Sequence, residues 1–160
     1  MHEKPLVTVT VCARNGAQWV VDCLDAIHAQ THRPLEIIAV NDGSTDSTGA
    51  LMDQWKQSNA VSDVRISIIQ QDALVLAAGR MIALQEAQGD WVAITDIDVR
   101  PERDWIEQLL VANVPVGDET IVAVTGRTIF QTHTDIVSRF RAIEIASKYR
   151  SRPRRTSLAN

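Results

Sequence analysis

The stretch LEIIAVNDGSTDST (35–48) decides the fold class of this 160-residue chain. Its first six residues are an apolar run that is too short for a helix, so they predict a buried strand. The eight residues after it supply a glycine for a tight turn, and Ser44, Thr45 and Asp46 as helix caps. A helix near 46–57 is therefore predicted to follow the strand directly. A strand that passes into a helix in this way is the repeating unit of a parallel α/β sheet.

The same alternation continues along the chain. Asn15 is expected to cap a helix over 19–27, and Pro101 to open a helix that contains Trp105 and Leu110. Further strands are predicted at 6–12, 64–70, 91–95 and 120–126, and further helices near 78–88 and 134–149. Because the strands are apolar on both faces, they predict a mostly parallel sheet with helices on both sides.

The charge is spread unevenly over the chain. The formal net charge is −4, but residues 139–160 hold seven Lys and Arg and one acid, which leaves −10 for residues 1–138. An acidic body does not suit a protein that binds nucleic acid, but it suits a domain that recruits a metal cation. The basic segment is interpreted as a solvated helix face and a flexible tail over 150–160. The alternative is that it holds an anionic substrate or membrane headgroups.

The length predicts a single domain over residues 1–160. Cys12 and Cys23 fall in a predicted strand and on the apolar face of a predicted helix, so both are expected to be buried free thiols in a reducing compartment. No signal peptide and no apolar run of about 18 residues is present. We therefore expect a cytoplasmic protein, in solution or at the inner face of the membrane. The histidines have no zinc-binding spacing and are expected at the surface: His2, His28, His32 and His133.

Polar residues follow three of the predicted strands at the point where each strand ends. They are Ala13–Asn15, Asn41–Asp46 and Asp96–Asp98. Ligands of open parallel sheets bind at the carboxyl ends of the strands. The three segments therefore predict one binding site at that edge of the sheet.

Asp96 and Asp98 end a buried run one residue apart. Residues i and i+2 of a strand point to the same face, about 6.6 Å apart along the chain. Two carboxylates so close repel each other unless a cation lies between them. Mg²⁺ and Mn²⁺ bind carboxylate oxygens and complete their shell with water and substrate phosphates. The pair therefore predicts a metal–diphosphate site, and the alternative is that both aspartates cap the helix that starts at Pro101.

Asp42 and Arg80 are further candidates for ligand contacts. The Asp42 carboxylate is expected to be free to accept a hydrogen bond from a ligand N–H, such as that of a pyrimidine base. The alternative for Asp42 is a capped turn with no ligand. Arg80 begins the predicted helix 78–88 and could pair with a phosphate, and the alternative is a solvated side chain.

Three blocks of the chain together resemble the family 2 glycosyltransferases, which have the GT-A fold. The blocks are VTVTVCARNGAQWVVDCLDAIHAQT, LEIIAVNDGSTDST and AGRMIALQEAQGDWVAITDIDVRPERDWIEQLL. Their order and spacing match over most of residues 6–110. The chain departs from the pattern at Cys12, where proline is usual, at Met81, where asparagine is usual, and at 73–75, where a glycine is missing.

The resemblance implies a role for individual residues. Ala13, Arg14 and Asn15 would line the nucleotide pocket, and Asp42 would hydrogen-bond the base. Three further residues would act beyond the base: Arg80 near the ribose and diphosphate, Asp96 near the ribose and sugar and as a second metal neighbour, and Asp98 as the ligand of Mn²⁺ or Mg²⁺.

The resemblance also implies the reaction. A sugar would pass from a nucleotide-diphosphate donor, first of all a UDP-sugar, to a hydroxyl of a saccharide or a lipid-linked glycan, with inversion. The acceptor side and catalytic base of the family follow the segment that matches residues 150–160. We therefore expect an N-terminal portion without an assignable base, and exposed apolar surface that could support a homo-oligomer.

Two other functions compete with this interpretation. ITDIDV also fits the D-x-D-x-V/T pattern of haloacid-dehalogenase-like phosphatases, but these need a later lysine and a later acidic pair, and only Lys148 follows. The other is a non-catalytic nucleotide-binding or interaction domain that retains the GT-A fold. The D-x-D speaks against a pure scaffold, which has no use for two adjacent carboxylates at a strand end.

Overall fold

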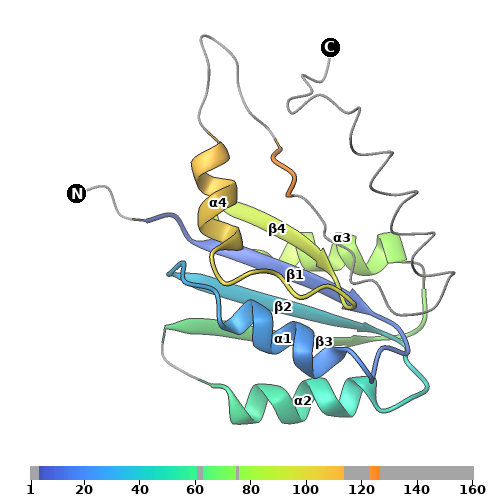
Figure 1. Ribbon diagram of the computed structural model, residues 1–160. Coiled ribbons are helices and arrows are strands. Elements are labelled where there is room, and N and C mark those ends of the chain that lie inside the picture. Colours follow the sequence, from blue (N-terminus) through green and yellow to red (C-terminus); the bar gives the residue numbers. More distant parts are fainter. Residues whose placement is uncertain (1–3, 61–62, 75, 114–122, 127–160) are drawn as a thin grey trace, which may run out of the picture. The chain divides into compact units, whose positions relative to one another are not determined.

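The computed structural model describes residues 4–60, 63–74, 76–113 and 123–126. In these residues four strands alternate with four helices (Figure 1). The elements are β1 (Val7–Ala13), α1 (Val20–His28), β2 (Leu35–Asp42), α2 (Thr48–Ser58), β3 (Val64–Gln71), α3 (Leu76–Glu86), β4 (Trp91–Asp96) and α4 (Trp105–Ala112).

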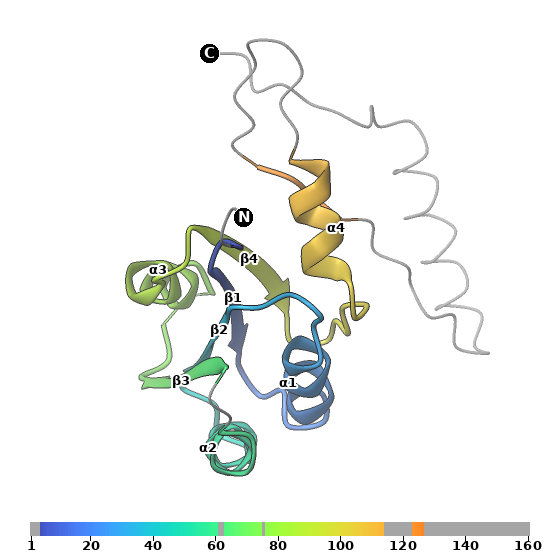
Figure 2. The same cartoon turned by 90° about the vertical axis from the view of Figure 1, so that its left-hand side faces the viewer.

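The four strands form one parallel sheet in the order β3-β2-β1-β4. The chain moves from β1 to β3 in one direction and then crosses back, so that β4 lies on the other side of β1. Helices α1 and α2 lie on one face of the sheet and α3 lies on the other (Figure 2). The predicted fold class, a mostly parallel α/β sheet with helices on both sides, is confirmed. The reversal between β1 and β4 is the position where ligands bind in such sheets.

The core is divided unequally between the two faces of the sheet. The larger cluster packs alternate residues of β1 and β2, such as Val9 and Ile37, against α1, α2 and Ile106 of α4. The smaller cluster lies under α3 and consists of Cys12, Ile38, Val40 and Ala83. Both cysteines are buried free thiols, as the sequence predicted.

The α3 face of the sheet is not wholly apolar, which differs from the expectation for β1 and β2. Glu36 is buried in it, and its Oε2 accepts hydrogen bonds from Thr8 Oγ1 at 2.6 Å and from the Gln88 backbone N–H at 2.8 Å. The Gly89 N–H donates to Thr8 Oγ1 at 2.9 Å. These bonds satisfy the buried carboxylate, and they tie the turn between α3 and β4 to the centre of the sheet.

Three helices begin later than the sequence predicted, and α2 does so by two residues, at Thr48 instead of near 46. Residues 16–19 form a turn in which the N–H groups of Trp19 and Val20 both donate to the Gly16 carbonyl, so α1 starts at Val20 and Asn15 does not cap it. Similarly, α4 starts at Trp105, four residues after Pro101. Local propensity indicated the helices correctly, but the loops before them follow contacts with other elements.

Two histidines are not at the surface, so that expectation was wrong for them. His32 is 2% exposed, and its Nε2 lies 2.8 Å from the Pro5 carbonyl oxygen. His28 is half-buried, with its ring edge-on to Trp55 at 5.7 Å between centroids. Both side chains pack near the C-terminal end of α1. The periodicity of apolar residues alone does not predict that these histidines are buried.

Several predictions fall on residues that the structure does not describe. They are the residues 120–122 of a predicted strand, the helix near 134–149, the tail 150–160, His2 and His133. Residues 123–126 do not form a strand. The chain divides into two compact units, Met1–Val124 and Thr125–Asn160, and a single domain over 1–160 stays a prediction. No helix within the described ranges is long and apolar enough to cross a membrane.

Candidate functional site

The carboxyl ends of all four strands meet at one edge of the sheet. The register pairs Ala13 with Asn41, Cys12 with Asp96, and Asp42 with Gln71. The three polar segments that the sequence singled out therefore lie at the same edge, as predicted.

The loop after β1 is bound to the loop after β2. The Asn15 N–H donates to Ser44 Oγ at 3.0 Å, and Asn15 Oδ1 accepts the Thr45 N–H at 2.8 Å. The Gly16 N–H donates to Thr48 Oγ1 at 2.8 Å. Asn15 has a positive φ of 54°, which asparagine tolerates better than most residues. Its side chain is therefore used to hold the second loop and not to cap α1.

Asp46 joins the same two loops and bonds Thr48, the first residue of α2, although the N-cap position itself is held by Ser47. Its Oδ1 accepts the Thr48 N–H at 2.9 Å, and its Oδ2 accepts the Ala17 N–H at 3.2 Å. The hydrogen bond from the Thr48 hydroxyl, followed by that from the Thr48 N–H, lowers the pKa of the Asp46 carboxyl. Of the three predicted cap residues, Asp46 is the one whose side chain bonds the first turn of α2.

Asp42 is buried at the end of β2, and it is not free in the way that the sequence predicted. Its Oδ1 accepts hydrogen bonds from the Leu74 N–H at 2.9 Å and from Gln71 Nε2 at 2.7 Å. The Leu74 N–H, followed by the Gln71 amide, lowers the pKa of the Asp42 carboxyl, while burial opposes this. The carboxylate is thus held ionised by the segment that follows β3.

Gly43 allows this segment to approach the turn after β2. Its φ is 60°, and a Cβ at this position would lie 2.3 Å from the Ala73 backbone nitrogen. No side chain can be accommodated at that distance, so only glycine permits the contact. The backbone at 73–74 therefore packs directly on the turn that carries Asp42.

Arg80 and Asp96 form an ion pair between helix α3, which connects β3 to β4, and the end of β4. Arg80 lies in the first half of α3, and its Nη2 is 2.6 Å from Asp96 Oδ1. The side chains are 38% and 61% exposed. Both residues therefore reach the same site, as the resemblance implied, but here the arginine pairs with a carboxylate of the protein.

Asp98 does not continue the strand, so the two aspartates do not have the predicted i, i+2 strand geometry. Strand β4 ends at Asp96, whose carbonyl accepts the Val99 N–H at 3.1 Å in a turn. The alternative that both cap a helix at Pro101 is also wrong, because α4 begins at Trp105. Asp98 is exposed, and no ion pair joins it to another described residue.

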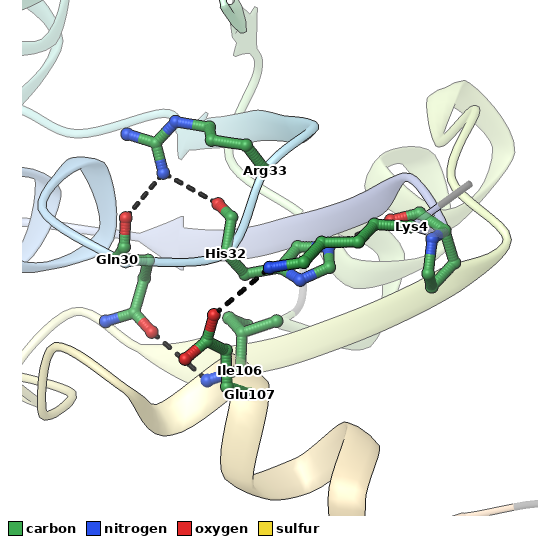
Figure 3. Close-up of polar contacts among 7 residues, drawn as sticks. Lys4, Gln30, His32, Arg33, Ile106 and Glu107 are labelled. Atoms are coloured by element: carbon green, nitrogen blue, oxygen red, sulfur yellow. Dashed lines mark hydrogen bonds and ion pairs between the residues drawn. The ribbon is translucent and has the colours of Figure 1, made fainter. Parts of the chain in front are cut away.

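The segment that carries Asp98 runs along α1 and is fastened to it at both ends. At its start the Cys23 thiol donates to the Asp96 carbonyl at 3.6 Å, and burial raises the pKa of this thiol to about 12, so it keeps its proton. At its end Gln30 donates to the Glu102 carbonyl at 2.7 Å. Gln30 Oε1 also accepts the Ile106 N–H at 3.1 Å (Figure 3). Helix α1 therefore determines the path of the loop between β4 and α4, residues 97–104, which we call the aspartate loop.

Comparison with known sequences identifies the family. The sequence model of glycosyl transferase family 2 matches residues 8–157. The chain belongs to glycosyl transferase family 2. The resemblance on which the sequence analysis relied is thus confirmed.

Relatives in this family are longer than the chain. EpsH of Bacillus subtilis (strain 168) is 32% identical over 146 residues, which are 83% of this chain and 40% of EpsH. The glycosyltransferase GlyA of Streptococcus pneumoniae serotype 4 (strain TIGR4) is 36% identical over 103 residues, 64% of this chain and 14% of GlyA. This family 2 chain therefore spans well under half the length of these curated relatives.

Solved structures agree with the fold of this family 2 chain. The mannosyltransferase PcManGT of Pyrobaculum calidifontis, in complex with GDP-Man and Mn²⁺, superposes with a TM-score of 0.63 and 29% identity, over 68% of this chain and 32% of PcManGT. S. aureus TarS 1–349, in complex with UDP, has a TM-score of 0.58 and 20% identity, over 67% of this chain and 31% of that protein. The GT-A fold is thereby confirmed.

Sequence reasoning missed two glutamines of the candidate site. Gln71 contacts Asp42, and Gln30 holds the aspartate loop. Gln71 was detectable in principle, because it directly follows the predicted strand 64–70 at the edge where ligands bind. Gln30 had no such signal, since the two partners that place it at the site, Glu102 and Ile106, are more than 70 residues away in sequence.

Two hollows in the surface of this family 2 chain lie away from the candidate site. One is lined by Arg33, Pro34 and Asp63 at the opposite edge of the sheet, and the other by Lys56, Ser67 and Gln88 beside β3. The candidate residues at the carboxyl edge, Asp42, Arg80, Asp96 and Asp98, line neither hollow.

Proposed function

We propose that this chain forms the donor-binding part of a transferase that moves a sugar from a nucleotide-diphosphate donor to an acceptor hydroxyl. The observation that carries the proposal is the meeting of Asp42, Arg80 and Asp96 at the carboxyl edge, where the strand order reverses between β1 and β4. Membership of family 2 supports sugar transfer in general.

Each residue has a proposed task. Asp42 accepts an N–H of the nucleotide base through the carboxylate oxygen that does not bind Gln71 and Leu74. Arg80 leaves Asp96, at least in part, to pair with the diphosphate, since an arginine is well shaped to bind phosphate oxygens. Ala13, Arg14 and Asn15, at the carboxyl end of β1, would line the nucleotide pocket.

Asp98, with Asp96 beside it, is the proposed holder of Mn²⁺ or Mg²⁺. The described residues contain no group of three or more Asp, Glu, His or Cys side chains that could hold an ion unaided. A small divalent cation needs only one or two carboxylates when phosphates and water supply the other ligands, so the exposed carboxylate of Asp98 fits. The metal would neutralise charge on the leaving diphosphate. PcManGT, which was solved with GDP-Man and Mn²⁺, supports this proposal.

The donor nucleotide is UDP or GDP in this proposal, with UDP-sugars first. TarS binds UDP and PcManGT binds GDP-Man, and both share the fold. The transfer would invert the anomeric carbon, with a hexose as the sugar, a saccharide or lipid-linked glycan as acceptor, and a carboxylate outside this chain as the base that deprotonates the acceptor hydroxyl.

A thermal-shift experiment tests the donor site. The wild type, Asp98→Asn and Asp42→Asn are heated with UDP, GDP or dTDP, each with and without Mn²⁺. At about 100 times its dissociation constant a ligand stabilises the fold by roughly 2.7 kcal/mol, which such a measurement detects. We expect a rise in Tm of the wild type that requires one nucleotide and Mn²⁺ together.

The two variants test the metal site and the base-binding site independently. Asp98→Asn should lose the contribution of Mn²⁺, and Asp42→Asn should lose the preference for one base. No shift of the wild type with any combination would contradict the proposal and would favour a domain that keeps the fold without binding a donor.

A further inference from the structure

Gln71 lies directly beside Asp42 because of the strand register. The two residues are paired across β2 and β3, each as the last residue of its strand. Gln71 Nε2 donates to Asp42 Oδ1 at 2.7 Å, and the Leu74 N–H donates to the same oxygen at 2.9 Å. Two donors on one oxygen fix the plane of the carboxylate and leave its other oxygen, Oδ2, for a ligand.

The orientation of the Gln71 amide follows from its partner. An ionised carboxylate only accepts hydrogen bonds, so the NH₂ group of the amide must face Asp42. The amide oxygen, Oε1, then points elsewhere, and it is buried without a hydrogen bond from any described residue. A buried unpaired acceptor costs about as much as one hydrogen bond contributes. Gln71 therefore adds little net stability, and its effect lies in holding the carboxylate.

Helix α3 leaves room for this amide. A Cβ on Gly79 would lie 3.5 Å from Gln71 Nε2 and 3.5 Å from Cys12 Sγ. The side chain of Gln71 is thus enclosed between Asp42 and the helix that carries Arg80.

We propose that Gln71 is a positioning residue for the donor nucleotide, because it holds the Asp42 carboxylate in the orientation in which Oδ2 accepts an N–H of the base. This inference rests on the proposed function, since it requires Asp42 to contact the base. Gln71 itself does not touch the ligand.

Calorimetric titration of the full chain with UDP and with GDP, each with Mn²⁺, tests the inference. Gln71→Met keeps the length of the side chain but removes the donor. We expect its affinity for the nucleotide to fall roughly ten- to a hundredfold, as the loss of a hydrogen bond to a charged group predicts. Its affinity for pyrophosphate with Mn²⁺, which lacks a base, should stay that of the wild type.

Gln70→Met is the matched control. Gln70 is the neighbouring residue on β3, and its side chain points to the other face. There its Nε2 donates to Asp53 Oδ2 at 3.2 Å and its Oε1 accepts from Asn41 Nδ2 at 2.6 Å. The variant therefore disturbs the residue before Asp42 without removing a bond to the Asp42 carboxylate. Its substitution should leave the nucleotide affinity within about twofold of the wild type.

Gln71→Glu separates positioning from a structural role. It places a second carboxylate against Asp42, so the two repel each other at neutral pH and share a proton in acid. Arg14 and Cys12 are the other titratable groups that act on Asp42. Burial raises the pKa of the Cys12 thiol, so this thiol stays protonated in the acid range. We expect weak binding at pH 7 that improves at pH 5, a profile that the wild type and Gln70→Met do not show.

The outcomes distinguish this inference from the proposed function. Binding by the wild type that is lost in Asp42→Asn but fully kept in Gln71→Met would overturn the inference alone. Equal losses for pyrophosphate and for nucleotide in Gln71→Met would also overturn it, because the defect would then be general. Absence of binding by the wild type would overturn both proposals.

Discussion

At the scale of single residues, the Arg80 side chain is expected to contribute little to the free energy of unfolding but much to the affinity for the donor. An exposed ion pair contributes about 0–1 kcal/mol to the free energy of unfolding, because water screens both charges. A guanidinium that binds a diphosphate contributes far more to affinity, since each bond is charge-assisted. The same side chain is therefore almost neutral for folding and important for the proposed donor.

Arg80→Gln should show this difference. We expect the free energy of unfolding in urea to change by less than about 1 kcal/mol, and the affinity for UDP or GDP with Mn²⁺ to fall at least about tenfold. Lys4→Gln, which removes the exposed Lys4–Glu107 pair, is the control and should change neither value notably. Unchanged nucleotide affinity in Arg80→Gln would contradict the phosphate role.

Asp46 makes the stability of the loops depend on pH. Its pKa is lowered in the folded state, chiefly by the hydrogen bonds from the Thr48 hydroxyl and N–H. Its contribution is therefore complete above the unfolded pKa of about 3.9, and it is lost as the pH falls through the lower folded value. Asp46→Asn should lose stability less steeply than the wild type below about pH 4, measured by urea unfolding at a series of pH values. An identical slope would show that these bonds do not favour the ionised form.

At the scale of elements, one side chain joins the end of α1 to the start of α4. Gln30 is 2% exposed, and it donates to the carbonyls of Ala26 and Glu102. Its Oε1 accepts the Ile106 N–H (Figure 3). The first N–H groups of a helix have no partner within the helix. Gln30 supplies one to α4, and so it fixes where the loop after Asp98 ends.

Gln30→Met should destabilise the protein by about 1–3 kcal/mol, because it leaves the buried Ile106 N–H without its partner. Urea unfolding measures this change. Gln108→Met provides the comparison, since Gln108 is exposed and donates only to Asp104 within α4, and it should cost less than about 0.5 kcal/mol. Similar values for both variants would mean that the junction does not depend on Gln30.

At the scale of the whole molecule, the two faces of the sheet differ in how firmly they hold their helices. Four residues of α1 are buried in the larger cluster, whereas α3 buries only Gly79 and Ala83. Several large apolar side chains of α3 remain exposed, among them Met81 and Leu84. A helix with few buried contacts opens locally at a lower free energy. The helix that carries Arg80 is thus less firmly packed than the helix that guides the aspartate loop.

Native-state hydrogen exchange should detect this difference. We expect the amides of α3 to exchange faster than those of α1 and β2, and to become more protected when UDP or GDP binds with Mn²⁺ through Arg80. The amides of α2, which carries none of the proposed donor residues, should change little. Equal protection of α1 and α3 without ligand would contradict the unequal packing.

The sequence by itself determined the order of strands and helices in the described residues, the parallel sheet and the family. Short apolar runs and helical periodicity depend on neighbours within a few residues, so they can be read without a structure. For the same reason the polar strand ends at Asp42 and Asp96 could be predicted. Their placement at one edge followed from the parallel arrangement of the strands.

Only the tertiary structure decided which side chains meet at that edge. Gln71 reaches Asp42 through the β2–β3 register, Asn15 binds Thr45 across two loops, and Arg80 pairs with Asp96 across the crossover. These partners lie 16 to 30 residues apart in sequence. Local pattern carries no information about such pairs, because strand register and loop packing bring them together only when the sheet has formed.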